Sequence, residues 1–293
     1  MSRVTSIEEL SNLKSKIETE RKFTKQVLIC GGTGCISSGS NEIADKMTEK
    51  VKAAGKENEI RVIKTGCFGF CEKGPIVKML PDNTFYTEVT PEDADRLVET
   101  HLLKEEKIEE LLFVDPVTKN KISDSDHMDF YKKQERVALR NCGVIDPENI
   151  EDYLLYDGYT ALDKVLKMSQ QEVVDIMKDS GLRGRGGGGF PTGLKWQFAL
   201  NNVSDQKYVV CNADEGDPGA FMDRSILEGD PHSVVEAMAI CGYSIGSNHG
   251  LVYIRAEYPL AVERLIKAIE QARENGFLGK NIYGTNFDFD IEI

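Results

Sequence analysis

Gly181–Leu194 is the stretch of this chain whose residues are best suited to bind a phosphorylated ligand. Seven of its fourteen residues are glycine, and an interior glycine costs a helix roughly 1 kcal/mol relative to alanine. We therefore predict a loop whose backbone N–H groups can approach a ligand closely. Arg185 and Lys195 add positive charge, and Phe190 adds a flat apolar surface. These residues suit a ligand with a phosphate and a planar ring; a flexible linker is the alternative.

A second polar stretch, Cys211–Gly219, places three carboxylates after a predicted strand. A phosphate would avoid Asp214, Glu215 and Asp217 because like charges repel, whereas sugar hydroxyls and ring N–H groups would hydrogen-bond to them. Asn212 adds an amide. Together the two stretches suit flavin mononucleotide (FMN), the first binding its phosphate and ring and the second its ribityl hydroxyls and ring edge. The alternative for the second stretch is an acidic surface turn.

Two cysteine pairs could hold a metal cluster: Cys30 with Cys35, and Cys67 with Cys71. Structural zinc sites usually contain C-x2-C pairs, and neither spacing here matches them. The C-x4-C and C-x3-C spacings, with glycines beside them, favour a [2Fe–2S] cluster whose sulfides accept backbone N–H groups. Zinc, or a reduced site without metal, is the alternative. The remaining cysteines are too scattered to form a cluster and are predicted to be buried thiols: Cys142, Cys211 and Cys241.

The elements around the cysteine pairs predict a compact α/β domain of thioredoxin type. An amphipathic helix over 2–20, with Ser6 and Glu9 as a capping box, precedes this domain. The helix between the first two strands makes them parallel, so both cysteine pairs emerge at the same edge of the sheet. The expected order is strand 26–29, helix 40–54, strand 59–64, a hairpin of 75–80 with 84–89, and helix 91–103.

Alternating strands and helices predict a second, Rossmann-like α/β domain after a charged segment. Ser169 and Glu172 form another capping box, and His232, at a helix start without an apparent nucleophile partner, is predicted to be structural. Helices are expected at 148–156, 161–167, 170–178, 195–201 and 260–275, and strands at 207–210, 250–255 and 287–293. A further helix is expected from about Ser225, with Pro231 marking a second start that runs through Ile240. The predicted domains are an N-terminal helix at 1–22, a thioredoxin-like domain at 23–105, a linker at 106–140 and the second α/β domain at 141–293.

Composition and charge restrict the class of protein. The chain has 293 residues and a net charge of −13, which argues against nucleic acid or an anionic membrane as its main partner. No apolar run approaches the roughly 20 residues of a membrane span, and the N-terminus lacks the apolar core of a signal peptide. We expect a cytoplasmic protein without membrane insertion, whose cysteines bind metal or stay as thiols rather than form disulfides.

Four motifs resemble the FMN- and NADH-binding subunit of respiratory complex I: GLRGRGGGGFPTGLKW, NADEGDPG, DRSILEGDPH and GKNIYGTNFDFDIEI. The resemblance runs from about Asn141 to Ile293, and the cysteine pattern is similar to that of the thioredoxin-like [2Fe–2S] ferredoxins. This combination most resembles the beta (diaphorase) subunit of multimeric NAD(P)-coupled, often electron-bifurcating [FeFe] hydrogenases. The alternating strand at 287–293 ends without a cap or turn, so we expect a C-terminally truncated member of the family.

The resemblance implies roles for individual residues. The glycine-rich loop and the acidic stretch would hold FMN, and two aromatic rings would sandwich the adenine of the nicotinamide cofactor. Asp217 would face the nicotinamide where respiratory members usually carry glutamate, which favours the hydrogenase branch. No side chain need act as a general acid or base, because the cofactors supply the chemistry. The implied residues are Gly184, Arg185, Gly186, Lys195, Asn212, Asp214 and Glu215 for FMN, and Phe190 and Phe198 for the adenine.

The function implied by the resemblance is that of an NAD(P)H dehydrogenase subunit. A hydride would pass between NAD(H) or NADP(H) and FMN, and single electrons would then reach iron–sulfur clusters, including those of partner subunits. The expected partners are a catalytic hydrogenase or dehydrogenase subunit and a thioredoxin-like [2Fe–2S] subunit. A [4Fe–4S] cluster and further FMN ligands would lie beyond Ile293, so this chain alone is expected to be inactive.

Three other functions are alternatives. The chain could be a non-catalytic [2Fe–2S] electron carrier whose second domain serves as an assembly platform for partner subunits. It could also belong to an NAD-dependent formate dehydrogenase. A structural protein stabilised by zinc is disfavoured by the cysteine spacing.

Overall fold

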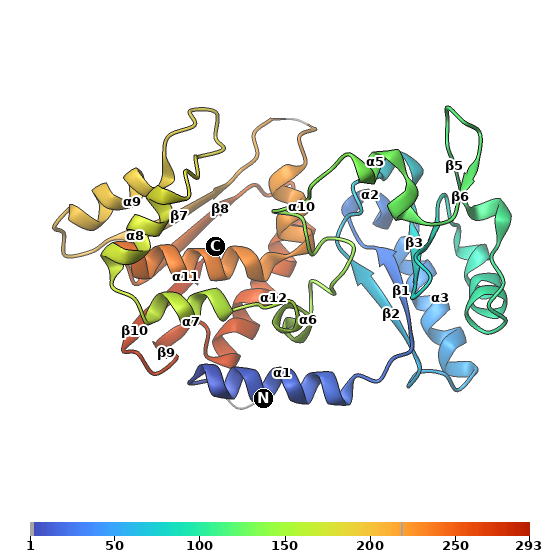
Figure 1. Ribbon diagram of the computed structural model, residues 1–293, viewed down its shortest axis with the longest axis horizontal. Coiled ribbons are helices and arrows are strands. Elements are labelled where there is room, and N and C mark those ends of the chain that lie inside the picture. The colour runs from blue at the N-terminus through green and yellow to red at the C-terminus, as the bar shows by residue number, and fades with distance from the viewer. Residues whose placement is uncertain (1–2, 218) are drawn as a thin grey trace. The chain divides into compact units, whose positions relative to one another are not determined.

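The protein is a mixed α/β chain that divides into two compact units (Figure 1). The structure, a computed structural model, describes residues 3–217 and 219–293. Met1, Ser2 and Pro218 lie outside these ranges, although sequence predictions for the first helix and the acidic stretch include them. The N-terminal unit comprises Glu18–Pro147 with Glu228–Asp230, and the C-terminal unit comprises Met1–Ile17, Glu148–Leu227 and Pro231–Ile293.

A four-stranded sheet with the order β2-β1-β3-β4 forms the centre of the N-terminal unit. Its strands are β1 (Lys25–Cys30), β2 (Ile60–Thr65), β3 (Val77–Leu80) and β4 (Thr84–Tyr86). Strands β1 and β2 pair in parallel, because helix α3 (Ser40–Ala53) crosses between them, whereas β3 pairs antiparallel with β1 and with β4. The predicted order of elements in this domain is confirmed.

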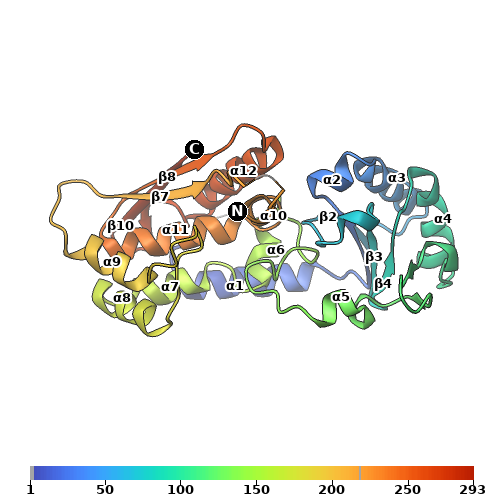
Figure 2. The same cartoon turned by 90° about the horizontal axis from the view of Figure 1, so that it is seen from above.

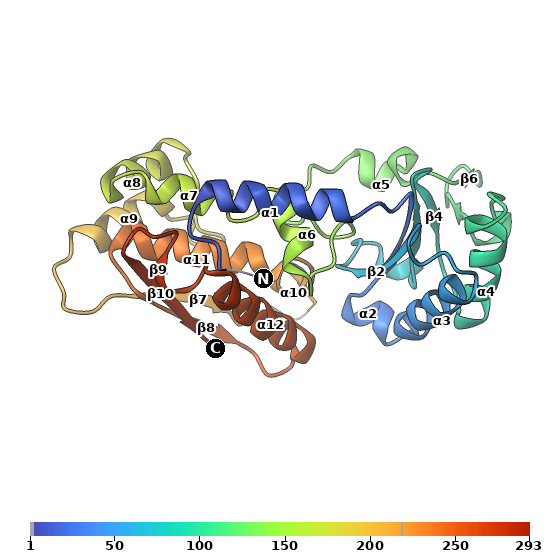
Figure 3. The ribbon, with the colours of Figure 1, turned by 90° about the horizontal axis from the view of Figure 1, so that it is seen from below.

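Strand β1 alternates its side chains between the two faces of this sheet. Val27 and Ile29 belong to the core shared with α3 and with the helical stretch 91–102, which consists of a 3-10 turn (Pro91–Asp93), α4 (Ala94–Arg96) and a π-helical turn (Leu97–Leu102). Figure 3 shows α3 and α4 together on this face. Leu28 and Cys30 point to the opposite face and belong to a second core. This period of two is the geometry of a strand buried on both sides.

The second face is covered by the segment that the sequence predicts as a linker. A short hairpin pairs β5 (Phe113–Val114) with β6 (Lys121–Ile122), and helix α5 (Asp129–Lys132) follows. Phe113 and Met128 are buried against the face that carries Leu28. The structure therefore differs from the expected linker, because an apolar sheet face exposed to water would forfeit the stabilisation that burial provides. The other predicted domain boundaries stay a prediction.

The C-terminal unit contains a second four-stranded sheet, in the order β7-β8-β10-β9. Strands β7 (Tyr208–Ala213), β8 (His249–Ile254) and β10 (Phe287–Glu292) are parallel neighbours, and β9 (Gly279–Ile282) pairs antiparallel with β10. Strand β9 was not predicted. Because β10 lies between two other strands, the alternating segment 287–293 is an interior strand rather than an edge.

Helices pack on this second sheet and on one another. Helix α11 contacts β7, β8 and β10, and α12 lies beside α11 (Figure 3). Helices α8 and α9 lie side by side (Figure 2). The predicted capping box of α8 is confirmed, with Ser169 and Glu172 bonding in both directions. The bounds are α6 (Ile150–Leu155), α7 (Thr160–Leu166), α8 (Gln170–Asp179), α9 (Thr192–Asn201), α10 (Met222–Gly229), α11 (Pro231–Ile245) and α12 (Pro259–Asn275).

The first helix, α1 (Ile7–Glu20), begins later than predicted. Ser6 Oγ accepts the backbone N–H of Glu9 at 3.2 Å, as a capping box requires. The Glu9 carboxylate, however, accepts the backbone N–H and the hydroxyl of Thr5 at 2.6 and 2.8 Å. One of the two hydrogen bonds of the predicted capping box therefore forms. In place of the second, the Glu9 carboxylate bonds to Thr5 instead of Ser6.

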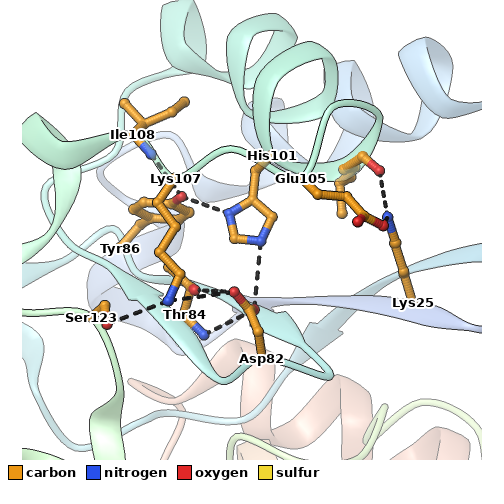
Figure 4. Close-up of polar contacts among 10 residues, drawn as sticks. Lys25, Asp82, Thr84, Tyr86, His101, Glu105, Lys107, Ile108 and Ser123 are labelled. Atoms are coloured by element: carbon orange, nitrogen blue, oxygen red, sulfur yellow. Dashed lines mark hydrogen bonds and ion pairs between the residues drawn. The ribbon is translucent and has the colours of Figure 1, made fainter.

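A buried polar chain joins the π-helical turn to the sheet of the N-terminal unit (Figure 4). The Tyr86 hydroxyl oxygen accepts the backbone N–H of Ile108 at 3.1 Å, so its proton is available to His101 Nδ1, 2.6 Å away. His101 Nε2 then faces Asp82 Oδ1 at 3.5 Å. Burial lowers the pKa of His101, which keeps the imidazole neutral and suits it to this donor–acceptor order.

Replacing Tyr86 with phenylalanine should destabilise the N-terminal unit by about 1–3 kcal/mol, because two buried polar groups lose their partner. Urea unfolding followed by circular dichroism measures the change in the free energy of unfolding. Tyr253→Phe, at a residue that is 65% exposed, is the matched control and should change stability little. Equal stabilities for the two variants would contradict this description of the polar chain.

His232 is buried in the first turn of α11, as its predicted structural role requires. Its Nδ1 lies 2.9 Å from the Tyr159 hydroxyl and its Nε2 lies 3.0 Å from Gln271 Oε1. Burial lowers the pKa of His232 to about 4. Because the amide oxygen can only accept, Nε2 carries the proton and Nδ1 accepts from the tyrosine.

The depressed pKa of His232 makes stability depend on pH. Between pH 6.5 and about 4, the unfolded chain binds a proton at this histidine and the folded chain does not, so stability falls as the pH falls. Urea unfolding at pH 7 and pH 5 should differ by up to about 2 kcal/mol from this group. His232→Gln should reduce that difference, and a difference as large as in the wild type would contradict the assignment.

Candidate functional site

The structure brings the four predicted cluster cysteines together at one edge of the N-terminal sheet. Cys30 ends β1, Cys35 lies in the short helix α2 (Thr33–Ile36), Cys67 follows β2, and Cys71 begins a 3-10 turn. Because β1 and β2 are parallel, their carboxyl ends lie side by side. The sulfurs of Cys67 and Cys71 are 3.5 Å apart, and the Cys30 thiol hydrogen-bonds with both Cys35 and Cys67.

These contacts make the cysteine site costly to ionise without a cation. The hydrogen bond with Cys35 raises the pKa of Cys30 to about 12, and the hydrogen bond with Cys30 raises the pKa of Cys67 to about 11. The same bond to Cys30 lowers the pKa of Cys35. Metal ligation needs thiolates, so a bound metal would compensate the charge that four adjacent thiolates accumulate.

The number of clustered cysteines fits a [2Fe–2S] cluster. Each iron of a [2Fe–2S] cluster takes only two protein thiolates. Two pairs of cysteines, one from each loop, are the donor set that such a cluster needs.

At two positions, the backbone of a glycine lies so close to a cysteine that a larger residue would not fit. A Cβ at Gly32 would lie 3.1 Å from Cys67 Cβ, and a Cβ at Gly74 would lie 2.6 Å from Cys35 Sγ. The backbone N–H of Gly69 already donates to Cys67 Sγ at 3.2 Å. Bare backbone beside the sulfurs fits a cluster, because N–H groups can reach its sulfur atoms.

The glycine-rich loop connects α8 to α9 and is closed at its base. Gly184 N donates to Phe190 O at 2.9 Å, and Thr192 N donates to Leu182 O at 2.9 Å. Residues 185–188 between these bonds, including Arg185 and Gly186, are exposed. The loop is therefore held at its two ends and presents its glycine backbone to solvent, as a phosphate-binding loop requires.

Helix α9 places two of the predicted residues close to this loop. Lys195 lies in its first turn and Phe198 follows one turn later. The rings of Phe190 and Phe198 have centroids 6.3 Å apart and are tilted by 45°. This is an ordinary tilted aromatic pair, and one ring would have to turn before a planar base could lie between them.

The acidic stretch begins inside a strand. Strand β7 runs to Ala213, three residues beyond the predicted end, so Cys211 and Asn212 belong to the strand. Asn212 Oδ1 accepts the backbone N–H of Asp214 at 3.2 Å, which shapes the turn after the strand. Asp217 is exposed. The strand continues further than predicted because its residues still pair in register with β8, as far as Ala213 opposite Ile254.

Glu215 has a structural task that the sequence does not reveal. Its carboxylate accepts the backbone N–H groups of Met222, Asp223 and Arg224, the last two at 3.2 and 3.0 Å. It therefore caps the start of α10, where orphan N–H groups need an acceptor. Its φ of 47° is left-handed, a conformation that is strained for a residue with a side chain.

Arg255 contacts the predicted acidic stretch and was not selected from the sequence. Its Nη1 donates to the Glu215 carbonyl at 2.9 Å, and its guanidinium lies 5.3 Å from the centre of the Tyr258 ring. It follows β8 directly, at the edge of the sheet where β7 delivers the acidic stretch. The sequence could have indicated Arg255, because it is an arginine directly after a predicted strand, and ligands of α/β sheets bind at the carboxyl ends of the strands.

The two predicted FMN-binding stretches lie on the same side of the C-terminal unit. Figure 1 shows the α8–α9 loop and the loop after β7 projecting in the same direction. One loop offers exposed glycine backbone with Arg185 and Lys195, and the other offers Asn212 and Asp214. The first loop can receive an anionic group, and the second can receive a set of hydroxyls.

The remaining cysteines lie outside the four-thiol site. Cys142 is buried, as predicted, and burial raises its pKa to about 12. Cys211 and Cys241 are only partly buried, and burial raises the pKa of both thiols. In the described part of the chain, no helix combines the length and the apolar character that crossing a membrane requires.

Two protein families match separate parts of this chain. Residues 177–293 match the family described as the Nuo51 FMN-binding domain. Residues 3–102 match the thioredoxin-like [2Fe–2S] ferredoxins. The first match contains the glycine-rich loop and the acidic stretch, and the second contains all four clustered cysteines.

Individual relatives match parts of this chain. The NADP-reducing hydrogenase subunit HndC of Solidesulfovibrio fructosivorans is 69% identical over 162 residues, covering 55% of this chain and 33% of that protein. An NADH-quinone oxidoreductase subunit of Aquifex aeolicus (strain VF5) is 51% identical over 145 residues, covering 50% and 34%. A crystal structure of a thioredoxin-like [2Fe–2S] ferredoxin from Aquifex aeolicus is 31% identical with a TM-score of 0.29, covering 32% of this chain and 99% of its own. The chain spans about a third of the length of these curated relatives.

Gly74→Ala should disrupt the four-cysteine site, because its Cβ would lie 2.6 Å from Cys35 Sγ. Gly74 has a φ of −76°, which alanine adopts without strain, so the loss must come from the contact. Iron bound per chain after anaerobic reconstitution should fall well below the wild-type value. Gly34→Ala, where a Cβ would meet no atom within 4 Å, is the control and should retain iron; equal loss in both variants would contradict the geometry.

Proposed function

We propose that this chain, which belongs through residues 177–293 to the Nuo51 FMN-binding family and through residues 3–102 to the thioredoxin-like [2Fe–2S] ferredoxins, is an NAD(P)H-dependent electron-transfer subunit. The proposal rests on the observation that the same chain contains a site of four cysteine thiols and two loops suited to bind FMN. A hydride acceptor and a one-electron carrier are the two parts needed to pass electrons from a nicotinamide cofactor to iron–sulfur partners.

The residues of the C-terminal unit would bind and orient the flavin. Arg185 and Lys195 would neutralise its phosphate while the backbone of Gly184 and Gly186 approaches it closely. FMN would accept a hydride from the nicotinamide and release electrons one at a time. Asn212, Asp214 and Glu215 would bond to the ribityl chain and ring edge, Phe190 and Phe198 would contact the adenine of NAD(H) or NADP(H), and Asp217 would face the nicotinamide.

The Glu215 cap refines this proposal. Its carboxylate already accepts three backbone N–H groups at the start of α10. Glu215 would therefore contribute to FMN binding mainly by fixing the backbone of the loop after β7. Arg255 holds the same loop through the Glu215 carbonyl. Together they would keep Asp214 in place beside the flavin.

A hydrogenase complex is the assembly that we favour. The 69% identity to the NADP-reducing hydrogenase subunit HndC and the aspartate at position 217 support this branch over a respiratory dehydrogenase. The partners would be iron–sulfur subunits, namely a catalytic subunit and a thioredoxin-like [2Fe–2S] subunit. A [4Fe–4S] cluster would belong to the part of the full-length protein that the relatives possess and this chain does not cover. We place this function in the cytoplasm.

A second candidate is a [2Fe–2S] electron carrier without flavin chemistry. The tilt of 45° between Phe190 and Phe198 and the engagement of Glu215 in the α10 cap are the observations that favour it. In that case the C-terminal unit would serve only to assemble partner subunits.

NADPH or NADH added anaerobically should reduce the cluster only when FMN is present, because the nicotinamide donates two electrons and the cluster accepts one. Electron paramagnetic resonance (EPR) of the full-length protein, with and without added FMN, measures this directly. Lys195→Gln should reduce flavin-dependent reduction at least about tenfold through lost phosphate binding, and Lys164→Gln on α7 is the control.

The outcome also separates the two candidates. In the full-length protein, a cluster that dithionite reduces, with no bound FMN and no effect of NADPH or NADH, would favour the pure electron carrier and contradict the proposed function.

A further inference from the structure

The second cysteine loop is the more exposed half of the four-thiol site. Cys30 and Cys35 are buried, whereas Cys67 is only partly buried and Cys71 is exposed. The loop runs from the end of β2 into the 3-10 turn Cys71–Lys73. A loop this exposed needs support from outside its own sequence if it is to hold two ligands in a fixed geometry.

That support comes from residues 131–136, in the segment predicted as a linker. The Tyr131 hydroxyl donates to the Phe68 carbonyl at 3.0 Å, and Arg136 Nη2 donates to the Cys67 carbonyl at 3.4 Å. The Tyr131 ring also packs edge-on against Phe85, with centroids 5.9 Å apart. Two consecutive carbonyls of the cysteine loop are thus held by one short segment.

Arg136 also brings a permanent positive charge to the site. Burial raises the pKa of Tyr131 and of Cys142, and in both cases the charge of Arg136 opposes the rise while Cys67 and Cys30 add to it. Arg136 Nη2 lies 3.4 Å from the carbonyl oxygen of Cys67, so the guanidinium lies beside a predicted cluster ligand. In a chain of net charge −13, a cation beside the metal ligands has a clear electrostatic effect.

We propose that Arg136 is a positioning residue that fixes the Cys67 loop and stabilises the reduced form of the [2Fe–2S] cluster; this inference rests on the cluster of the proposed function. The thiolates and sulfides carry more negative charge than two ferric ions balance. One-electron reduction, by the flavin or by dithionite, adds a further negative charge without adding a proton. The guanidinium opposes that charge, so it favours uptake of the electron.

Redox titration of the full chain, followed by the EPR signal of the reduced cluster, tests the proposal. Arg136→Gln should lower the midpoint potential, so that the ratio of reduced to oxidised cluster at a fixed potential falls at least about threefold. Arg140→Gln removes the same charge from an exposed residue of the same segment and should leave the potential at the wild-type value. Arg136→Lys keeps the charge and should stay near the wild type.

Each result bears on the proposal. A lower potential in Arg136→Gln alone supports it, whereas equal shifts in Arg136→Gln and Arg140→Gln, or no shift with iron retained, overturn it. If Arg136→Gln loses its iron, Arg136→Lys decides: a wild-type potential supports the proposal and a lowered one overturns it. A wild-type chain without any [2Fe–2S] signal would contradict the proposed function itself, so the two failures are distinguishable.

Discussion

The parallel pairing of β1 with β2 is the constraint on which the candidate metal site depends. Parallel strands end at the same edge of a sheet, and each of these two strands leads directly into a loop that carries a pair of cysteines. Any shift in their register would move Cys30 away from Cys67, since Cys30 lies opposite Thr65 at the end of the ladder. Helix α3 makes this pairing possible because only a crossover connection joins neighbouring parallel strands.

The same sheet explains why the segment after the thioredoxin-like core is ordered. Strand β1 buries side chains on both faces, and α3 covers only one of them. Phe113 and Met128 cover the other, and burying each such side chain contributes roughly 1.5–3 kcal/mol. Once Met128 is fixed, Tyr131 and Arg136 lie within reach of the cysteine loop. A requirement of packing thus places two polar side chains at the metal site.

Much of this arrangement could be predicted from the sequence, because strong local signals and simple topology coincide. The strand–helix–strand order predicts parallel strands, and parallel strands bring Cys30 and Cys67 together. Other features have no local signal. Strand β9 (Gly279–Ile282) lacks apolar alternation and forms because β10 offers a free edge. The cap formed by Glu215 depends on residues seven to nine positions away. The segment that covers the Leu28 face of the N-terminal sheet contributes single apolar residues that stand among charged ones. Such residues form no periodic pattern, so the sequence does not indicate that this segment is buried.

We propose that the four clustered cysteines hold an iron–sulfur cluster that carries electrons. The most direct test is the visible and EPR spectrum of the anaerobically purified 293-residue chain, with iron, sulfide and zinc analyses of the same sample. We expect about two irons and two sulfides per chain and visible absorption that dithionite bleaches. Cys30→Ser and Cys67→Ser should each abolish the spectrum. Bound zinc without visible absorption would contradict an iron–sulfur cluster and would leave the N-terminal unit without a redox function.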